Sequence, residues 1–308
     1  MKGRPRFAPR RDLGKTGFRV TALGVGDVAD RALPFEQCVA TVRRALDFGL
    51  NLVDTAPSYE NGYSEEIVGA ALRGRREDVF LIDKIDHVDR PVAEQVEGSL
   101  ARLALPSTDL FVFHGISSLD DWRKLAAPGG GFDELAECVR RGQTRFRGIS
   151  SHHPDVLAQA IPSSLCDVVM FSIGPHVDER YVRETLPLAR AHRVGTVCFK
   201  TFGAGKLLGD TPGYNQPLKE RPRGKFSSGG ETLSPAPVLP HMTVTECVRF
   251  TMTVDPDVAL LGMSFANEQD EALDAAERFL PLSPAEMLAV QQRAAAAVVG
   301  KGVCHWNP

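Results

Sequence analysis

Residues 79–103 read VFLIDKIDHVDRPVAEQVEGSLARL, and this stretch contains the unit from which most of the chain is built. Its first seven residues form a short, largely apolar run that is typical of a buried β-strand. After a polar turn, Val92, Val96, Leu100 and Leu103 recur at helical spacing and would cover one face of an amphipathic helix. The stretch therefore predicts a β/α unit, in which a strand is followed by a helix that packs against it.

The same unit recurs along the whole chain. The predicted strands are residues 20–26, 51–56, 79–85, 110–114, 146–150, 167–172, 195–200 and 258–263. Almost continuously apolar strands joined by helices favour a parallel sheet that is covered on its outer side. Eight such units in 308 residues predict an α/β fold, a closed (β/α)8 TIM barrel that forms one domain over residues 1–308.

Four segments lie outside the repeat. The glycine-punctuated segment 12–20 is typical of a β-hairpin, which would cap the bottom of the barrel. The stretch 283–300 begins Ser-Pro-Ala-Glu, a helix N-terminus, so an extra C-terminal helix is expected there. Segment 201–241 is long and rich in Pro, Gly and Ser, which favours a lid over the barrel mouth, with a disordered segment as the alternative. The tail 304–308 either folds back over the mouth or frays.

Composition restricts the class of partner. The 36 Lys and Arg nearly balance 39 Asp and Glu, so the chain offers no bulk attraction to nucleic acid or to an anionic membrane. Its apolar runs are far shorter than the ~20 residues of a membrane span, and its basic start leads into no apolar secretion core. We therefore expect a small-molecule partner, no nucleic acid, no membrane and a cytoplasmic location. The oligomeric state is left open.

The six cysteines are scattered, with no Cys-x-x-Cys pair and no Cys/His cluster at metal-ligand spacing. They are expected to be mostly core residues, and no metal site is predicted.

Polar side chains stand where successive predicted strands end. Asp54 lies at the end of the second strand and is followed by Thr-Ala-Pro-Ser-Tyr59, Lys84 lies at the end of the third, and His114 ends the fourth. In a (β/α)8 barrel these ends meet at one rim, where the active site lies. Each residue alone has an ordinary structural explanation, such as a helix cap or a surface charge. Four acid/base groups at three successive strand ends together predict a catalytic site.

The segment Asp54-Thr-Ala-Pro-Ser-Tyr59, with Lys84 and His114, resembles the signature of the aldo-keto reductases. The resemblance covers essentially the whole chain and includes residues 13–24, 138–150 and 200–205. It implies an NAD(P)H-dependent enzyme, an oxidoreductase that transfers a hydride between NAD(P)H and an aldehyde or ketone and, in reverse, oxidises an alcohol.

The resemblance makes Tyr59 the general acid. A free phenol has a pKa near ~10, too high for easy proton donation at neutral pH, and a cation such as Lys84 would lower it. Asp54 would hold Lys84 in place and keep it charged. His114 would orient the carbonyl and form a hydrogen bond to its oxygen as negative charge develops.

The resemblance also implies where the nicotinamide binds, with two departures from the family pattern. Family members usually hold the carboxamide with a Ser-Asn pair and a Gln, and these positions here are Ser150-Ser151 and Met170. Phe199 stands at the ring-stacking position, where it can supply the same face contact as the more usual Tyr.

The remaining cofactor contacts are expected after the last two strands. Lys200 and the backbone of Gly203 and Gly205 would bind the pyrophosphate. The adenosine end is expected at Gly262, Ser264, Asn267 and Gln269. Members of the family usually use NADPH, which favours this cofactor here. However, residues 262–276 contain no Lys or Arg and Asp270 follows Gln269, so NADH stays open.

Three other interpretations were weighed. Residues 24–29 match the first part of a Rossmann fingerprint, but the helical pattern begins too late after them, which favours the end of the first strand. His152-His153 favours a loop or helix start over a metal pair, with His152 close to the cofactor ring.

The rival function is a cofactor-binding accessory or regulatory protein of the same fold with little turnover. The absence of the usual Asn and Gln side chains favours this rival function, whereas the presence of Asp54, Tyr59, Lys84 and His114 opposes it. The sequence does not identify the substrate, whose specificity is expected from the rim loops 116–132 and 201–241.

Overall fold

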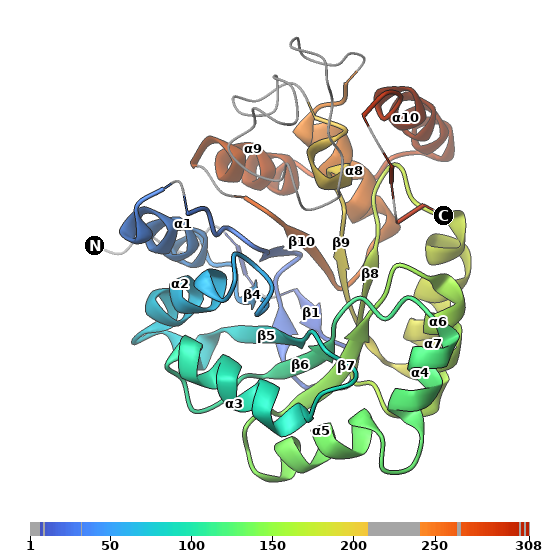
Figure 1. Cartoon of the computed structure of the whole chain (residues 1–308). Helices are drawn as coiled ribbons and strands as arrows, with labels where there is room; N and C mark the ends of the chain where they lie inside the picture. Colours follow the sequence, from blue (N-terminus) through green and yellow to red (C-terminus); the bar gives the residue numbers. More distant parts are fainter. Residues whose placement is uncertain are drawn as a thin grey trace.

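Eight parallel strands close into a barrel, and helices surround it on the outside (Figure 1). The computed structural model describes residues 7–8, 10–31, 33–208, 241–263, 266–301, 303–304 and 306–307, and for residues 266–268 it describes the backbone alone. Around the barrel the strands follow the order β10-β3-β4-β5-β6-β7-β8-β9, so consecutive strands are neighbours and the last pairs with the first.

All eight predicted strands are confirmed. They are β3 (Leu23–Val25), β4 (Leu52–Asp54), β5 (Phe80–Ile85), β6 (Leu110–Phe113), β7 (Phe146–Ser150), β8 (Val168–Ser172), β9 (Gly195–Phe199) and β10 (Val258–Leu261). The first is shorter than predicted because Val20 pairs within the N-terminal hairpin instead. The Rossmann alternative is wrong, since the residues after β3 lead only to a helix that begins at Phe35.

Helices follow the strands in turn, as the repeat predicts. They are α1 (Phe35–Asp47), α2 (Tyr63–Leu72), α3 (Val92–Leu103), α4 (Leu119–Ala126), α5 (Gly131–Arg140), α6 (Pro154–Ala160), α7 (Leu186–His192), α8 (Val244–Val254), α9 (Ala266–Glu277) and α10 (Pro284–Ala297). Short helical turns add η1 (Arg76–Asp78), η2 (Ile161–Ser163), η3 (Tyr181–Thr185) and η4 (Gly203–Gly205). No helix among the described residues is both long and apolar enough to cross a membrane.

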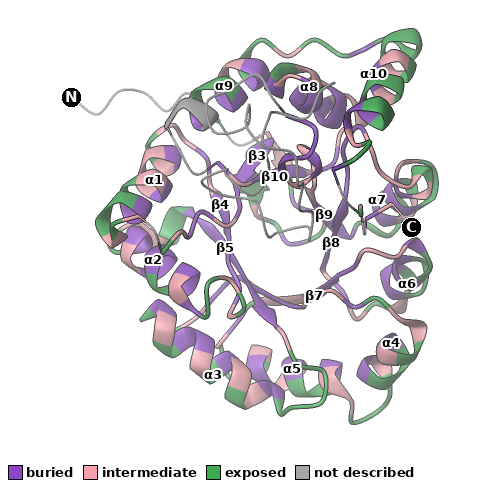
Figure 2. Ribbon diagram, turned by 45° about the horizontal axis from the view of Figure 1, so that its top comes forward, coloured by how far each residue is buried: buried purple, intermediate pink, exposed green. Residues whose placement is uncertain are grey.

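Side chains alternate between two environments along each strand, as a pleated strand requires. Leu52, Ile82, Val112 and Met170 pack in the barrel interior. Their sequence neighbours, such as Val53, face outward and pack under the helices. Figure 2 shows the resulting pattern, with buried strands at the centre and helices whose outer faces are exposed. Period-two alternation therefore also fixes which polar residues at the strand ends face the barrel axis.

The predicted hairpin forms from β1 (Arg11–Asp12) and β2 (Arg19–Val20). Leu13, between them, packs into the barrel interior. Gly14, with a φ of +52°, comes so close to the start of β9 that a Cβ would lie 2.2 Å from the Gly195 nitrogen. The hairpin thus caps the end of the barrel at which the strands begin, and the opposite end holds the site.

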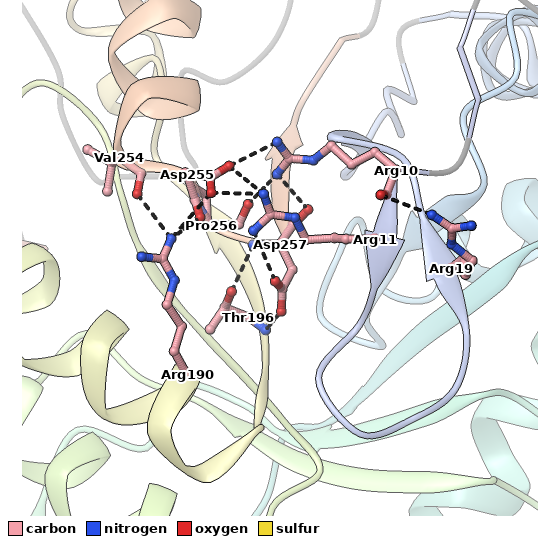
Figure 3. Close-up of polar contacts among 9 residues, drawn as sticks. All are labelled: Arg10, Arg11, Arg19, Arg190, Thr196, Val254, Asp255, Pro256 and Asp257. Carbon is pink, nitrogen blue, oxygen red and sulfur yellow. Dashed lines mark hydrogen bonds and ion pairs between the residues drawn. The ribbon is translucent and has the colours of Figure 1, made fainter. Parts of the chain in front are cut away.

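Ion pairs tie this hairpin to the segment between α8 and β10 (Figure 3). The carboxylate of Asp255 accepts hydrogen bonds from Arg10 at 2.9 Å and from Arg11 at 2.7 and 2.8 Å. Arg190 of α7 donates to the Asp255 carbonyl oxygen at 2.5 Å, and Arg11 lies 3.6 Å from Asp257. Each pair is partly exposed and contributes little alone, but the network joins positions as far as 247 residues apart.

The extra C-terminal helix is confirmed as α10. It begins as its sequence predicts, because Ser283 and Glu286 form a reciprocal capping box around the Pro at the first helical position.

The expectation of a rim loop over residues 116–132 is only partly right, because that segment contains α4. Ser118 accepts from the Asp121 N–H and starts the helix. Trp122 is buried against Phe132 of α5, with ring centroids 5.6 Å apart, so it packs in the outer core.

The lid prediction for residues 201–241 falls mostly on residues 209–240, which lie outside the described part of the chain. The prediction for the cysteines holds, since Cys38, Cys138, Cys166, Cys198 and Cys247 are buried and Cys304 is half-buried, all as free thiols.

Candidate active site

The carboxyl ends of β4, β5 and β6 bring Asp54, Lys84 and His114 to one mouth of the barrel. Each stands two residues after an interior core residue of its own strand, so the alternation that buries Leu52 and Ile82 also turns these polar groups toward the axis. The structure therefore brings the predicted groups together.

Asp54 and Lys84 form a buried ion pair. The Lys84 Nζ donates to Asp54 Oδ1 at 2.8 Å, to Asp54 Oδ2 at 2.7 Å and to the Thr55 carbonyl at 2.7 Å. The two side chains are only 2% and 3% exposed. Burial alone would lower the pKa of Lys84, but the charges of Asp54 and Tyr59 outweigh it and raise that pKa above its usual value. Lys84 is thus a fixed cation.

Tyr59 lies on the turn after β4, beside this cation. The Lys84 Nζ is 4.4 Å from the centroid of the Tyr59 ring. Burial nevertheless raises the pKa of Tyr59 to about 12, although the charge of Lys84 acts to lower it. Lys84 has the predicted effect, but the lowered pKa expected for Tyr59 is wrong, because burial outweighs that effect. Glu60 and Asn61 follow with φ values of +51° and +53°, so the turn that carries Tyr59 holds two strained residues.

His114 packs against Tyr59 and has a partner that sequence reasoning missed. The two rings meet edge-on with centroids 5.8 Å apart. The His114 Nδ1 lies 2.5 Å from Oδ1 of Asp86, and Ser58 Oγ donates to the same oxygen at 3.3 Å. Asp86 follows Lys84 by two residues. The alternation that turns Lys84 toward the barrel axis was therefore the signal that could have found Asp86.

A second acidic group lies behind the site. Asp83 is fully buried on the outer face of β5, opposite Lys84, and Glu65 of α2 is fully buried in an ion pair with Arg102 of α3. Burial raises the pKa of Asp83 well above its usual value, and the charge of Glu65 adds to this rise. Its Oδ2 has no hydrogen-bond partner within the described structure.

The positions expected to hold the carboxamide are engaged with the protein itself. Ser150 Oγ accepts from the Gly115 N–H at 2.8 Å, and Ser151 Oγ donates to the Ile116 carbonyl at 2.6 Å. Met170 is fully buried in the barrel interior. These contacts position the loops around the mouth, and they leave carboxamide binding by Ser150, Ser151 and Met170 a prediction.

His152 and Ser172 stand next to the predicted ring-stacking residue. His152 lies edge-on to Phe199, with centroids 5.1 Å apart, and its Nδ1 is 3.3 Å from Ser172 Oγ. Phe199 is only partly buried, so its face can still accept a ring. His153 occupies the N-cap position of α6 without a side-chain capping bond, which matches the prediction of a helix start for this pair. No group of three metal-ligating side chains occurs among the residues described.

The turn after β9 is built from residues with left-handed backbone. Lys200, Gly203, Ala204 and Gly205 all have positive φ, from +51° to +82°. The N–H groups of Gly203 and Gly205, however, donate to the carbonyls of Lys200 and Phe202 at 2.8 and 2.9 Å, so they close the turn itself. Burial and, to a smaller degree, the nearby charge of Lys206 lower the pKa of Lys200 to about 8. Pyrophosphate binding by Lys200, Gly203 and Gly205 stays a prediction.

The described part of the tail folds back over this turn, so fraying is wrong for these residues. The buried Trp306 ring lies 5.0 Å from Lys200 Nζ and 5.3 Å from Lys206 Nζ. Its Nε1 donates to the His176 carbonyl at 2.9 Å, and Lys206 Nζ donates to the Val303 carbonyl. The tail therefore covers both lysines.

At the expected adenosine end, Gln269 is fully buried and bonded within the protein. Its Oε1 accepts from Arg44 of α1 at 2.9 Å, and its Nε2 donates to the Thr41 carbonyl at 2.9 Å. Arg44 also pairs with Asp270 at 2.7 Å. Arg44 therefore places a cation near the expected adenosine end, although residues 262–276 contain no Lys or Arg. Gly262 follows β10 directly, and the predictions for Ser264 and Asn267 lie outside the described side chains.

Comparison with known proteins identifies relatives of this chain. A sequence model of the Aldo/keto reductase family matches residues 22–291. The uncharacterized oxidoreductase YqkF of Bacillus subtilis is 27% identical over 287 residues, which cover 87% of this chain and 90% of YqkF. An NADH-specific methylglyoxal reductase of Escherichia coli is 27% identical, covering 64% of this chain and 66% of that protein. An aldo-keto reductase from Klebsiella pneumoniae, solved in complex with NADPH, has the same fold with a TM-score of 0.69 at 19% identity, covering 96% of this chain and 99% of that chain.

Proposed function

Because this chain belongs to the aldo/keto reductase family, we propose that Asp54, Tyr59, Lys84 and His114 are its catalytic residues. The family membership makes it an NAD(P)H-dependent oxidoreductase that transfers a hydride between the cofactor and an aldehyde or ketone. The observation that carries the residue assignment is the cluster at the mouth, where a buried cation and an imidazole flank one phenol.

NAD(P)H, when bound, supplies the hydride that adds to the carbonyl carbon. We propose Lys200 and the left-handed turn at Gly203 and Gly205 as the pyrophosphate site, because Lys200 is a cation at the carboxyl end of β9 in that turn. Phe199 would pack on the nicotinamide ring, with His152 beside it. We propose Ser150, Ser151 and Met170 as the walls of this subsite, with Gly203, Gly205 and Gly262 bringing backbone close to the cofactor. Ser264, Asn267 and Gln269 stay predictions for the adenosine end.

Tyr59 supplies the proton to the carbonyl oxygen. Its pKa of about 12 keeps the phenol protonated before reaction, so the proton is present when the oxygen arrives. As the oxygen gains negative charge, Lys84 stabilises the phenolate that forms. Asp54 keeps Lys84 in place, and His114 forms a hydrogen bond to the same oxygen.

NADPH is the proposed cofactor, with NADH as the alternative. The Klebsiella relative binds NADPH and the Escherichia coli relative is NADH-specific, so the family accommodates both. Arg44 supports NADPH, because it provides a cation near the adenosine end. Catalytic efficiency with the two cofactors, measured for the wild type and for Arg44→Met, tests this choice.

The experiment that tests the function follows cofactor consumption over a panel of aldehydes and ketones. We expect turnover with at least one class of carbonyl. Tight NADPH binding without turnover on any of them would identify the accessory protein instead. A cytoplasmic location and the absence of a nucleic-acid partner stay predictions from the sequence.

A further inference from the structure

The pair formed by Asp86 and His114 lies at the edge of the catalytic cluster. Asp86 comes directly after β5 and is 14% exposed, and His114, directly after β6, is 26% exposed. The backbone N–H of His114 donates to the Ile85 carbonyl at 2.9 Å, so backbone pairing between β5 and β6 continues up to this point. His114 is therefore held by strand backbone, and Asp86 directly follows the last residue of β5.

Asp86 is ionised in this position. Burial alone would raise its pKa, but hydrogen bonds and charge from His114, together with hydrogen bonds from Ser58, outweigh burial and hold that pKa below its usual value. No ion pair between described residues joins Asp86 to a lysine or arginine. The imidazole is therefore its main donor.

An ionised carboxylate can only accept hydrogen bonds. With Oδ1 2.5 Å from Nδ1, the shared proton belongs to the ring nitrogen. The bond made by one imidazole nitrogen fixes the state of the other, so Nε2 is the nitrogen left for a ligand. In the neutral ring Nε2 accepts a hydrogen bond, and in the protonated ring it donates one. Because a carbonyl oxygen can only accept, the bond proposed for reduction needs the ring protonated on both nitrogens, a form that the ionised Asp86 stabilises.

We propose that Asp86, steadied by Ser58, is a positioning residue that holds the Nδ1–H of His114 on its carboxylate and so presents Nε2, as the donor of the protonated ring, to the substrate oxygen beside Tyr59. This inference rests on the proposed function, in which His114 bonds to the reacting oxygen. Asp86 itself does not touch the substrate.

Asparagine in place of Asp86 offers the sharpest test. In Asp86→Asn the side-chain amide can donate to Nδ1 and so favour the opposite tautomer, with the proton on Nε2. Asp86→Glu keeps a carboxylate that can accept from Nδ1, so this variant should show the wild-type protonation of the His114 ring. Asp89→Asn is the matched control, because Asp89 lies three residues further along the same segment and is exposed.

The readout is the nitrogen-15 NMR signature of the His114 ring, assigned by its loss in His114→Gln and recorded without substrate. We expect protonated Nδ1 in the wild type, Asp86→Glu and Asp89→Asn, and a reversed pattern in Asp86→Asn. Thermal melting confirms that each variant is folded. A wild-type ring protonated only on Nε2, or a pattern that Asp86→Asn leaves unchanged, overturns the proposal.

Kinetics separate this inference from the proposed function. In Asp86→Asn we expect kcat to fall by roughly 10²-fold in both directions, the size of an acid/base contribution, with the Kd for NADPH unchanged. An unchanged kcat in Asp86→Asn would overturn the positioning role even if the tautomer reverses. A wild type that turns over no carbonyl would refute the proposed function, whereas the NMR pattern would still decide the Asp86 contact.

Discussion

The Nζ atom of Lys84 lies 4.4 Å from the centroid of the Tyr59 ring while it donates to both oxygens of Asp54. The cation is thus fixed beside the phenol before any substrate arrives. Such preorganisation stabilises phenolate at the moment it forms, without a movement of the charged groups.

Tyr59→Phe removes the proposed proton and little else, because the ring that packs against His114 stays. We expect kcat to fall by about 10²–10⁴-fold while the Kd for NADPH changes little. Steady-state kinetics and a fluorescence titration of the cofactor measure the two quantities. Near-normal turnover would rule Tyr59 out as the acid.

Lys84→Met leaves the buried Asp54 carboxylate without its partner. Removing one member of a buried ion pair costs about 3–5 kcal/mol, so the free energy of unfolding in urea should fall by that order. The double variant Asp54→Asn with Lys84→Met removes both charges and should recover much of the stability. Turnover should stay low in both variants. A double variant with wild-type kcat would show that the pair has only a structural role.

Lys200 should make cofactor binding depend on pH. Burial lowers its pKa to about 8, so the free protein loses this charge as the pH rises through that value. The anionic pyrophosphate favours the charged form. We therefore expect a constant Kd for NADH below about pH 8 and a rise above it, by at most about tenfold per pH unit.

NADH is the suitable probe because it lacks the titrating 2′-phosphate. The Lys200→Met variant should bind NADH weakly at every pH, with no rise through this range. A wild-type Kd that stays flat would contradict the assignment of Lys200 to the pyrophosphate.

Asp83→Asn should change how stability depends on pH. The pKa of Asp83 is raised by burial and then by Glu65. An acid with a raised folded-state pKa stabilises the fold fully below its unfolded-state pKa, and this contribution is lost as the pH rises through the folded-state pKa. The variant cannot ionise, so it should lose less stability than the wild type between acidic and neutral pH.

Urea unfolding at several pH values measures this difference. Asp120→Asn on α4 is the control, because that side chain is 80% exposed. If the free energy of unfolding changes with pH in the same way in Asp83→Asn and in the wild type, ionisation of Asp83 does not destabilise the fold.

Much of the barrel could be predicted from local sequence. Each strand is a short apolar run, and the alternation along β4, β5 and β6 that buries Leu52 and Ile82 also placed Asp54 and Lys84 at the mouth. Capping chemistry at Ser283 marked the start of α10. The start of α4 depends on one serine and a short amphipathic run, which is why its segment was expected to be a loop.

Contacts between distant positions could not be predicted in this way. Arg44 reaches Gln269 across 225 residues, and only the closure of the barrel brings α1 beside α9. The pKa of Tyr59 was misjudged for a related reason, since the sequence identified the cation but not the depth of burial that outweighs it. Asp86 is different, because strand alternation alone could have found it.

The ion pairs of the N-terminal hairpin bear on how the barrel is made. Arg10 is separated from Asp255 by 245 residues, and β3 pairs with the last strand, β10. A ribosome that adds ~5–20 residues per second would synthesise Asp255 roughly 10–50 s after Arg10. During that interval the nascent chain carries an open sheet with an unpaired apolar edge at β3. Barrel closure is then a late folding event, and until it occurs the unpaired edge of β3 is a site at which the growing chain can aggregate.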